Sequence, residues 1–165
     1  ALHDTIAFDN AIKTALEKMQ SIDPGLKNTL VVVTADHDHT LILNGYAQRT
    51  GKTTATNPGV LGLVKNVSSG ETELDADGMP YTVIGFGNGE NRVAGARNSV
   101  PALTEAVVAH KDYHQEAAVL MTVGNETHGG TDVPLMAIGL NAERFHGFMN
   151  NTDVFAILQD TLLNP

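Results

Sequence analysis

Apolar residues recur along this 165-residue chain in two spacings, one typical of helices and one typical of strands. Between residues 4 and 20 they return every three or four positions, which predicts an amphipathic helix. Short apolar runs rich in branched residues predict strands, because such side chains fit a pleated sheet. The predicted strands are residues 30–35, 81–86, 117–123 and 134–139, and the other predicted helices are residues 102–110 and 151–163.

This alternation of helical and strand patterns is typical of an α/β domain. We therefore expect a three-layer αβα arrangement whose four strands pair in a mixed or parallel sheet, incomplete at one edge. The helices at 4–20 and 151–163 are expected to pack on that sheet. Residues 44–78 are rich in Gly, Thr, Asn and Ser and show little periodicity. We interpret them as a long excursion from the domain, because long loops in compact domains are usually functional or disordered.

The most chemically informative segment, Thr34-Ala35-Asp36-His37-Asp38-His39, follows the apolar run at 30–33. Carboxylate oxygens and neutral imidazole nitrogens together form a ligand set that suits zinc. In an extended chain Asp36 and His37 point to opposite faces, so the strand must end there if both are to hold one metal. If the strand continues, His37 and His39 share a face instead. The remaining alternative is an ordinary polar loop.

A second cluster, Glu126-Thr127-His128-Gly129-Gly130-Thr131-Asp132-Val133, lies between two predicted strands. A histidine followed by two glycines indicates a tight turn where the backbone approaches a site closely. Taken alone, His128 reads as a hydrogen-bonded loop histidine. Together with the first cluster it becomes a candidate ligand, because a zinc site usually draws three or four ligands from separate segments.

One acidic segment imitates a metal loop without completing it. Glu73, Asp75, Asp77 and Gly78 match the start of a calcium loop, but Ile84 stands where a bidentate glutamate is needed. The segment therefore predicts a turn.

Charge and composition narrow the range of partners. The chain has 10 basic and 19 acidic residues and a formal charge of −9, which argues against nucleic acid or an anionic membrane surface. No apolar run approaches the roughly 20 residues that a membrane span needs. There is no cysteine, which excludes disulfides and thiolate ligands. The chain opens at Ala1 without the pattern of a signal peptide, and we expect either processing or a part of a longer protein.

Four segments, in this order, resemble the C-terminal part of the alkaline phosphatases. They are the opening Ala1-Leu2-His3-Asp4-Thr5-Ile6-Ala7-Phe8-Asp9, the first cluster with its Thr-Ala-Asp-His motif, Gly85-Phe86-Gly87-Asn88-Gly89, and the second cluster with its His-Gly-Gly loop. The resemblance implies an enzyme that hydrolyses phosphate monoesters through a phosphoserine intermediate, with two zinc ions and a nearby magnesium. Such ions lower the pKa of the nucleophile and offset charge on the transferred group.

The resemblance also implies roles for individual residues. Asp36 and His37 would bind the zinc that activates the serine, and His128 would bind the other zinc. His39 matches a histidine behind the ligands that orients them. The excursions at about 44–78 and 87–116 would be surface and dimer-contacting insertions. The family further implies a homodimer that is exported to the periplasm or outside the cell.

The sequence departs from the family pattern where the nucleophile should stand. It contains no Asp-Ser-Ala motif, no phosphate-binding arginine, no Asp-x-x-x-His pair and no magnesium ligands. Residues 1–165 thus resemble the C-terminal portion of the domain, with no catalytic nucleophile in this chain. We expect the isolated chain to be inactive without its N-terminal part. The alternatives are a non-catalytic metal-binding or structural domain, or a relative such as a sulfatase or phosphomutase, although the His-Gly-Gly loop favours a phosphatase.

Overall fold

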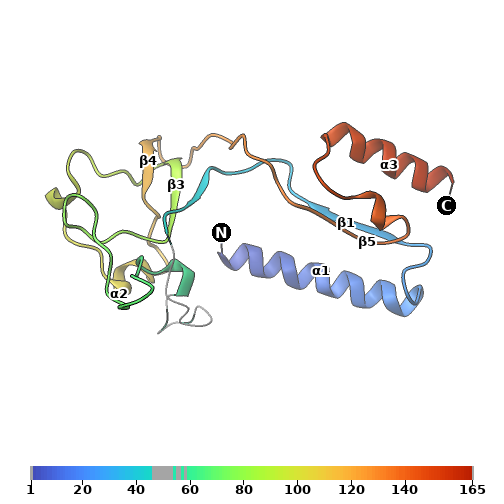
Figure 1. Cartoon of the computed structure of the whole chain (residues 1–165), viewed down its shortest axis with the longest axis horizontal. Coiled ribbons are helices and arrows are strands. Elements are labelled where there is room, and N and C mark those ends of the chain that lie inside the picture. Colours follow the sequence, from blue (N-terminus) through green and yellow to red (C-terminus); the bar gives the residue numbers. More distant parts are fainter. Residues whose placement is uncertain (1, 46–53, 55–56, 58, 165) are drawn as a thin grey trace. The chain divides into compact units, whose positions relative to one another are not determined.

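The computed structural model describes residues 2–45, 54, 57 and 59–164 (Figure 1). Parts of the predicted excursion at 44–78, namely 46–53, 55–56 and 58, lie outside the described residues. The fold is α/β, as predicted. Its elements in chain order are α1 (Leu2–Ile22), β1 (Leu30–Thr34), β2 (Leu41–Leu43), the 3-10 turn η1 (Gly59–Leu61), β3 (Ile84–Gly89), η2 (Arg97–Ser99), α2 (Glu105–Val108), β4 (Ala117–Leu120), β5 (Leu135–Gly139), η3 (Ala142–Arg144) and α3 (Asn151–Leu163).

The chain divides into two compact units. The terminal unit combines residues 1–36 with 133–165, and the central unit is residues 37–132. The first motif is split by this division, because Asp36 ends the first segment of the terminal unit and His37 begins the central unit.

The terminal unit is built on an antiparallel β1–β5 pair, in which Leu30 lies opposite Gly139 and Thr34 opposite Leu135. Figure 1 shows α1 and α3 on opposite sides of this pair. The turn after α1 is organised by Asp23, whose carboxylate accepts hydrogen bonds from the backbone and side chains of residues 27–29, and these bonds lower its pKa. This turn brings Leu26 into the interior, where it is 1% exposed.

The central unit contains a mixed three-stranded sheet. β3 lies in the middle, antiparallel to β2 and parallel to β4, and Phe86 of β3 is the partner of both Leu41 and Ala117. A small core forms beside the sheet. Its buried side chains are Leu63, Val64, Thr82, Val83, Val108 and Ala117.

The predicted single sheet is wrong, because the described strands pair in two separate sheets, one of two strands and one of three. The strand predicted at 81–86 is also displaced and begins at Ile84. Its first residues bond elsewhere: the Tyr81 carbonyl accepts from Val64 at 2.9 Å, and the Val83 amide donates to Gly62 at 3.0 Å. One apolar run is thus shared between two pairing partners.

The two long predicted helices are confirmed in position but not in packing, and the helix predicted at 102–110 is shortened to the four residues of α2. The helix expected at 4–20 extends over 2–22, and the helix expected at 151–163 matches α3. No described residue of α1 is buried, and its Ile6 and Phe8 are 49% and 55% exposed. β1 is only half-buried, and Met136 and Ile138 of β5 are exposed. Among the described residues, no helix has both the length and the apolar character required to cross a bilayer.

Candidate metal centre

The central unit brings His37 and His128, which are far apart in the sequence, into direct ring contact. Their imidazole centroids lie 3.5 Å apart and the ring planes are inclined by 11°. His39 completes a cluster of three imidazoles, with its centroid 4.9 Å from that of His37 and 5.9 Å from that of His128. Both predicted motifs therefore contribute to one place in the fold.

A short backbone bridge joins the two motifs. The Gly129 amide donates to the Asp38 carbonyl at 2.6 Å, as one pair of an isolated antiparallel bridge. A Cβ atom at position 129 would collide with the Asp38 side chain and would lie 2.9 Å from its Cβ. Glycine is therefore strongly favoured at this position, because a residue without a side chain allows the two backbones to approach this closely.

Hydrogen bonds orient two of the three imidazoles. The His37 Nδ1 lies 3.0 Å from the Asp38 carbonyl oxygen, and because that oxygen can only accept, Nδ1 is the donor of this hydrogen bond. His39 uses its Nδ1 to contact the Glu126 carboxylate. Metal-binding histidines usually have a hydrogen-bond partner of this kind on the ring nitrogen that does not bind the metal.

The loop before His128 is held by Asn88 of β3, a residue that the sequence analysis missed. Its side-chain amide accepts from the Thr127 backbone at 2.8 Å and donates to the Thr127 hydroxyl at 2.7 Å. Asn88 is 8% exposed, so these bonds are largely shielded from water. The available signal was a polar residue between two glycines in a strand, Gly87-Asn88-Gly89, which is unusual without a specific bonding partner.

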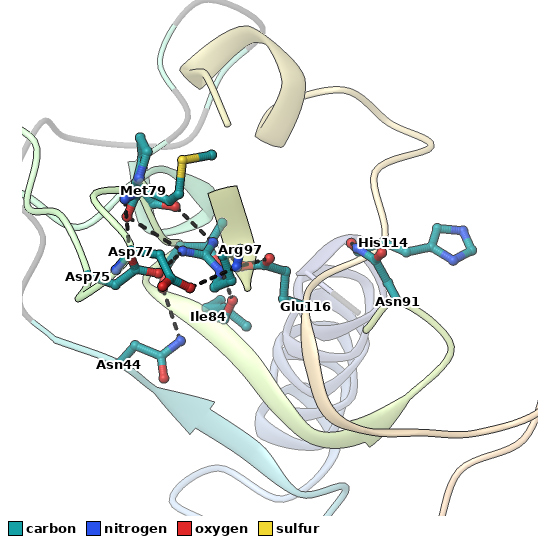
Figure 2. A network of polar contacts seen from close by, with 11 residues as sticks. Asn44, Asp75, Asp77, Met79, Ile84, Asn91, Arg97, His114 and Glu116 are labelled. Carbon is teal, nitrogen blue, oxygen red and sulfur yellow. Dashed lines mark hydrogen bonds and ion pairs between the residues drawn. The ribbon is translucent and has the colours of Figure 1, made fainter. Parts of the chain in front are cut away.

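A second polar network, centred on Arg97, organises the excursions and is shown in Figure 2. The guanidinium grips Glu116 with Nε at 3.2 Å and Nη2 at 2.7 Å, and it also contacts Asp75 and the Pro80 carbonyl. The Arg97 backbone amide donates to Asp77 at 2.7 Å. The acidic segment is therefore the turn that we predicted, and its carboxylates bind an arginine.

This network shifts the pKa values of its members. Hydrogen bonds from the Met79 amide and from Arg97 lower the pKa of Asp75. Burial, followed by the nearby charge of Glu116, raises the pKa of Tyr113 to about 12. The Tyr113 hydroxyl is buried and has no hydrogen-bond partner among the described residues.

The position of the third predicted ligand stays a prediction. Asp36 is exposed and belongs to the terminal unit, whereas His37 and His128 belong to the central unit. In the described part of the chain, no three His, Asp or Glu side chains gather as a complete metal site. The His37–His128 pair thus supplies donors of the right chemistry but not a full ligand set.

The comparisons with known proteins agree with the motifs. The family model described as alkaline phosphatase matches residues 1–163. The chain belongs to the alkaline phosphatase family. It is 36% identical over 149 residues to the tissue-nonspecific alkaline phosphatase isozyme of Rattus norvegicus, a match that covers 89% of this chain and 24% of that protein.

Other family members match over the same length. The tissue-nonspecific isozyme of Homo sapiens is 35% identical over 149 residues, covering 89% of this chain and 24% of that protein. The alkaline phosphatase of Gadus morhua is 33% identical, covering 89% and 26%. The chain therefore spans about a quarter of the length of the curated relatives that it matches.

Proposed function

We propose that this chain is the C-terminal portion of a metal-dependent phosphomonoesterase, an alkaline phosphatase that hydrolyses phosphate monoesters. The contact between His37 and His128 carries the proposal. Two motifs that the family resemblance identifies as ligand segments meet at one point, and their rings lie side by side. The family membership of the chain supports the same reaction class.

The donor chemistry fits zinc. His37 and His128 both contribute imidazole nitrogens at this point, and neutral imidazole nitrogen is a preferred zinc donor. We assign His37 and the adjacent Asp36 to one zinc and His128 to a second zinc, with the remaining ligands and the magnesium ligands outside this chain. When bound, the ions would lower the pKa of the nucleophile and offset the charge that develops during phosphoryl transfer.

In this proposal the residues of this chain hold and orient the metal ligands, and none of them is the nucleophile that attacks phosphorus. His39, paired with Glu126, fixes the second motif beside the first and is a positioning residue. The Asp38–Gly129 bridge sets the separation of the two ligand segments. We assign the nucleophile of the covalent step to a serine in the N-terminal part of the protein, because the chain lacks the family's Asp-Ser-Ala motif.

The exposed apolar residues on the strands support the presence of a further part of the protein that packs against them. Met136 and Ile138 of β5 and Val119 and Leu120 of β4 are 49–60% exposed, although each lies in a strand. Apolar strand faces of this kind are normally covered. We propose that the N-terminal part of the same protein covers them, and that the whole enzyme is a homodimer acting in the periplasm or outside the cell.

The experiment is a turnover assay with p-nitrophenyl phosphate at alkaline pH with added zinc and magnesium. The chain is assayed alone and joined to the N-terminal part of the protein. We expect turnover only in the joined form, abolished by His128→Ala and kept by His146→Ala, a control at an exposed histidine of the terminal unit. Turnover by the isolated chain would overturn the assignment of the nucleophile.

The same variants distinguish the proposal from a non-catalytic metal-binding domain. Zinc affinity is measured by competition with a chromogenic chelator on the joined protein. If zinc binds and His128→Ala weakens it, but no phosphate monoester is hydrolysed, the chain belongs to a non-catalytic metal-binding protein. If His128→Ala leaves both zinc affinity and turnover unchanged, His128 is not a ligand.

A further inference from the structure

Asn88 is the one polar side chain of β3 that is buried, and its side-chain hydrogen bonds reach Thr127 of the second motif and Thr40, the residue that follows the first motif. On one side its amide forms two bonds with Thr127, at 2.8 Å and 2.7 Å. On the other side its Nδ2 lies 3.5 Å from the hydroxyl of Thr40. Thr127 directly precedes His128, and Thr40 directly follows His39. All of these residues lie within the central unit.

The glycines beside Asn88 explain how it reaches both motifs. A Cβ atom on Gly87 would lie 3.2 Å from the Thr40 Cβ, and one on Gly89 would lie 3.2 Å from the Ala117 Cβ. Both contacts are tighter than nearly all real Cβ contacts. The glycines therefore let β3 approach the first motif on one side and β4 on the other, which places the amide between the two ligand segments.

The chemistry of an amide suits this place. The Thr127 backbone needs an acceptor and the Asn88 Oδ1 provides it, while Nδ2 donates to the hydroxyl oxygens. A leucine of similar size provides neither group. It would leave the Thr127 amide without its protein partner, and a backbone amide that loses its bond exchanges and moves more freely.

We propose that Asn88 is a positioning residue of the metal centre, which acts through Thr127 to hold His128 against His37. The proposal rests on the proposed function of His128 as a zinc ligand. Asn88 does not itself contact the imidazoles, so its effect is on where the ligand lies and not on the donor atom. Groups that hold ligands in this way typically change metal affinity by roughly 10–100-fold when they are removed.

The first test needs no metal. Hydrogen exchange detected by mass spectrometry is followed for the peptide covering residues 124–131 in the metal-free joined protein. We expect Asn88→Leu to accelerate exchange of the Thr127 amide by about tenfold, which corresponds to the loss of one hydrogen bond. Asn88→Asp, which keeps an acceptor, should restore most of the protection. The matched control is Asn91→Leu, because the Asn91 side chain bonds only to the His114 carbonyl among the described residues.

The second test uses zinc. Chelator competition should show affinity reduced by roughly 10–100-fold in Asn88→Leu, a smaller reduction in Asn88→Asp, and less than a twofold change in Asn91→Leu. Turnover of Asn88→Leu should recover as zinc is raised, with the KM for p-nitrophenyl phosphate little changed. Loss of overall folding would instead lower the melting temperature of the metal-free protein. We expect Asn88→Leu and Asn91→Leu to have similar melting temperatures in the metal-free form.

The outcomes separate this inference from the proposed function. Unchanged exchange at 124–131 in Asn88→Leu, or zinc affinity equal to that of the unmodified protein, overturns the positioning role. If His128→Ala leaves zinc affinity unchanged, the ligand assignment of His128 fails instead. Faster exchange at Thr127 in Asn88→Leu would then still show that Asn88 holds the loop, but that loop would not be a metal site, and the inference as stated would be wrong.

Discussion

Gly129→Ala tests the close approach that joins the two histidine motifs. The added Cβ would lie 2.9 Å from the Cβ of Asp38 and would collide with the rest of that side chain. Rotation about χ1 moves the Asp38 carboxylate away but leaves its Cβ in place. An ordinary contact begins at 3.4 Å, so the two backbones must separate by about half an ångström.

The separation lengthens the hydrogen bond of the bridge. The Gly129 amide and the Asp38 carbonyl are 2.6 Å apart, and an equal displacement brings them to a distance of about 3.1 Å, which weakens the bond without breaking it. Overpacking of this kind costs about 1–3 kcal/mol in well-packed sites. For a chain of this length, each 1 kcal/mol lowers the melting temperature by roughly 2–4 °C.

The assay is urea unfolding followed by far-ultraviolet circular dichroism, together with zinc affinity by chelator competition. We expect Gly129→Ala to lose about 1–3 kcal/mol of unfolding free energy and to bind zinc more weakly. Gly130→Ala is the matched control, because a Cβ at position 130 meets nothing within 4 Å. Equal effects from the two variants, or no effect from Gly129→Ala, would refute the argument that the bridge sets the spacing of the site.

Three further predictions address stability. Arg97→Ala should cost about 1–3 kcal/mol of unfolding free energy, because it removes the guanidinium that pairs with the part-buried carboxylates of Asp75 and Glu116. Arg92→Ala, at an exposed arginine, should change the unfolding free energy by less than about 0.5 kcal/mol, and urea titration measures both variants. Gly139→Ala should lower the melting temperature more than Gly147→Ala does. Both glycines have positive φ, but of these two positions only 139 would bring a Cβ into collision with backbone. The pKa of Tyr113 is raised from 10.0 to about 12 in the folded protein, so the unfolded state loses this proton first and the unfolding free energy should fall as pH rises from 10 to 12. Tyr113→Phe should reduce this fall in urea titrations at several pH values. An unchanged slope of unfolding free energy against pH in Tyr113→Phe would refute the prediction.

The sequence by itself determined the local elements with strong periodicity and the identity of the family. α1, α3, β1 and β5 lie where their patterns place them, because a 3.6-residue apolar spacing is typical of helices and a short, continuous apolar run is typical of buried strands. The Thr-Ala-Asp-His and His-Gly-Gly motifs indicated the family for a similar reason. The identity and order of residues within such a motif are local properties of the chain.

Only the tertiary structure decided which segments meet. The run at 81–86 has the pattern of one strand, yet its halves bond to different partners, because pairing depends on segments far away in the chain. The ring contact of His37 with His128 joins residues ninety-one positions apart. No sequence pattern specified the division into two sheets, and none specified that Arg97 binds Glu116 or that Asn88 binds Thr127. Such contacts form between side chains that the fold brings together, so a local pattern does not determine them.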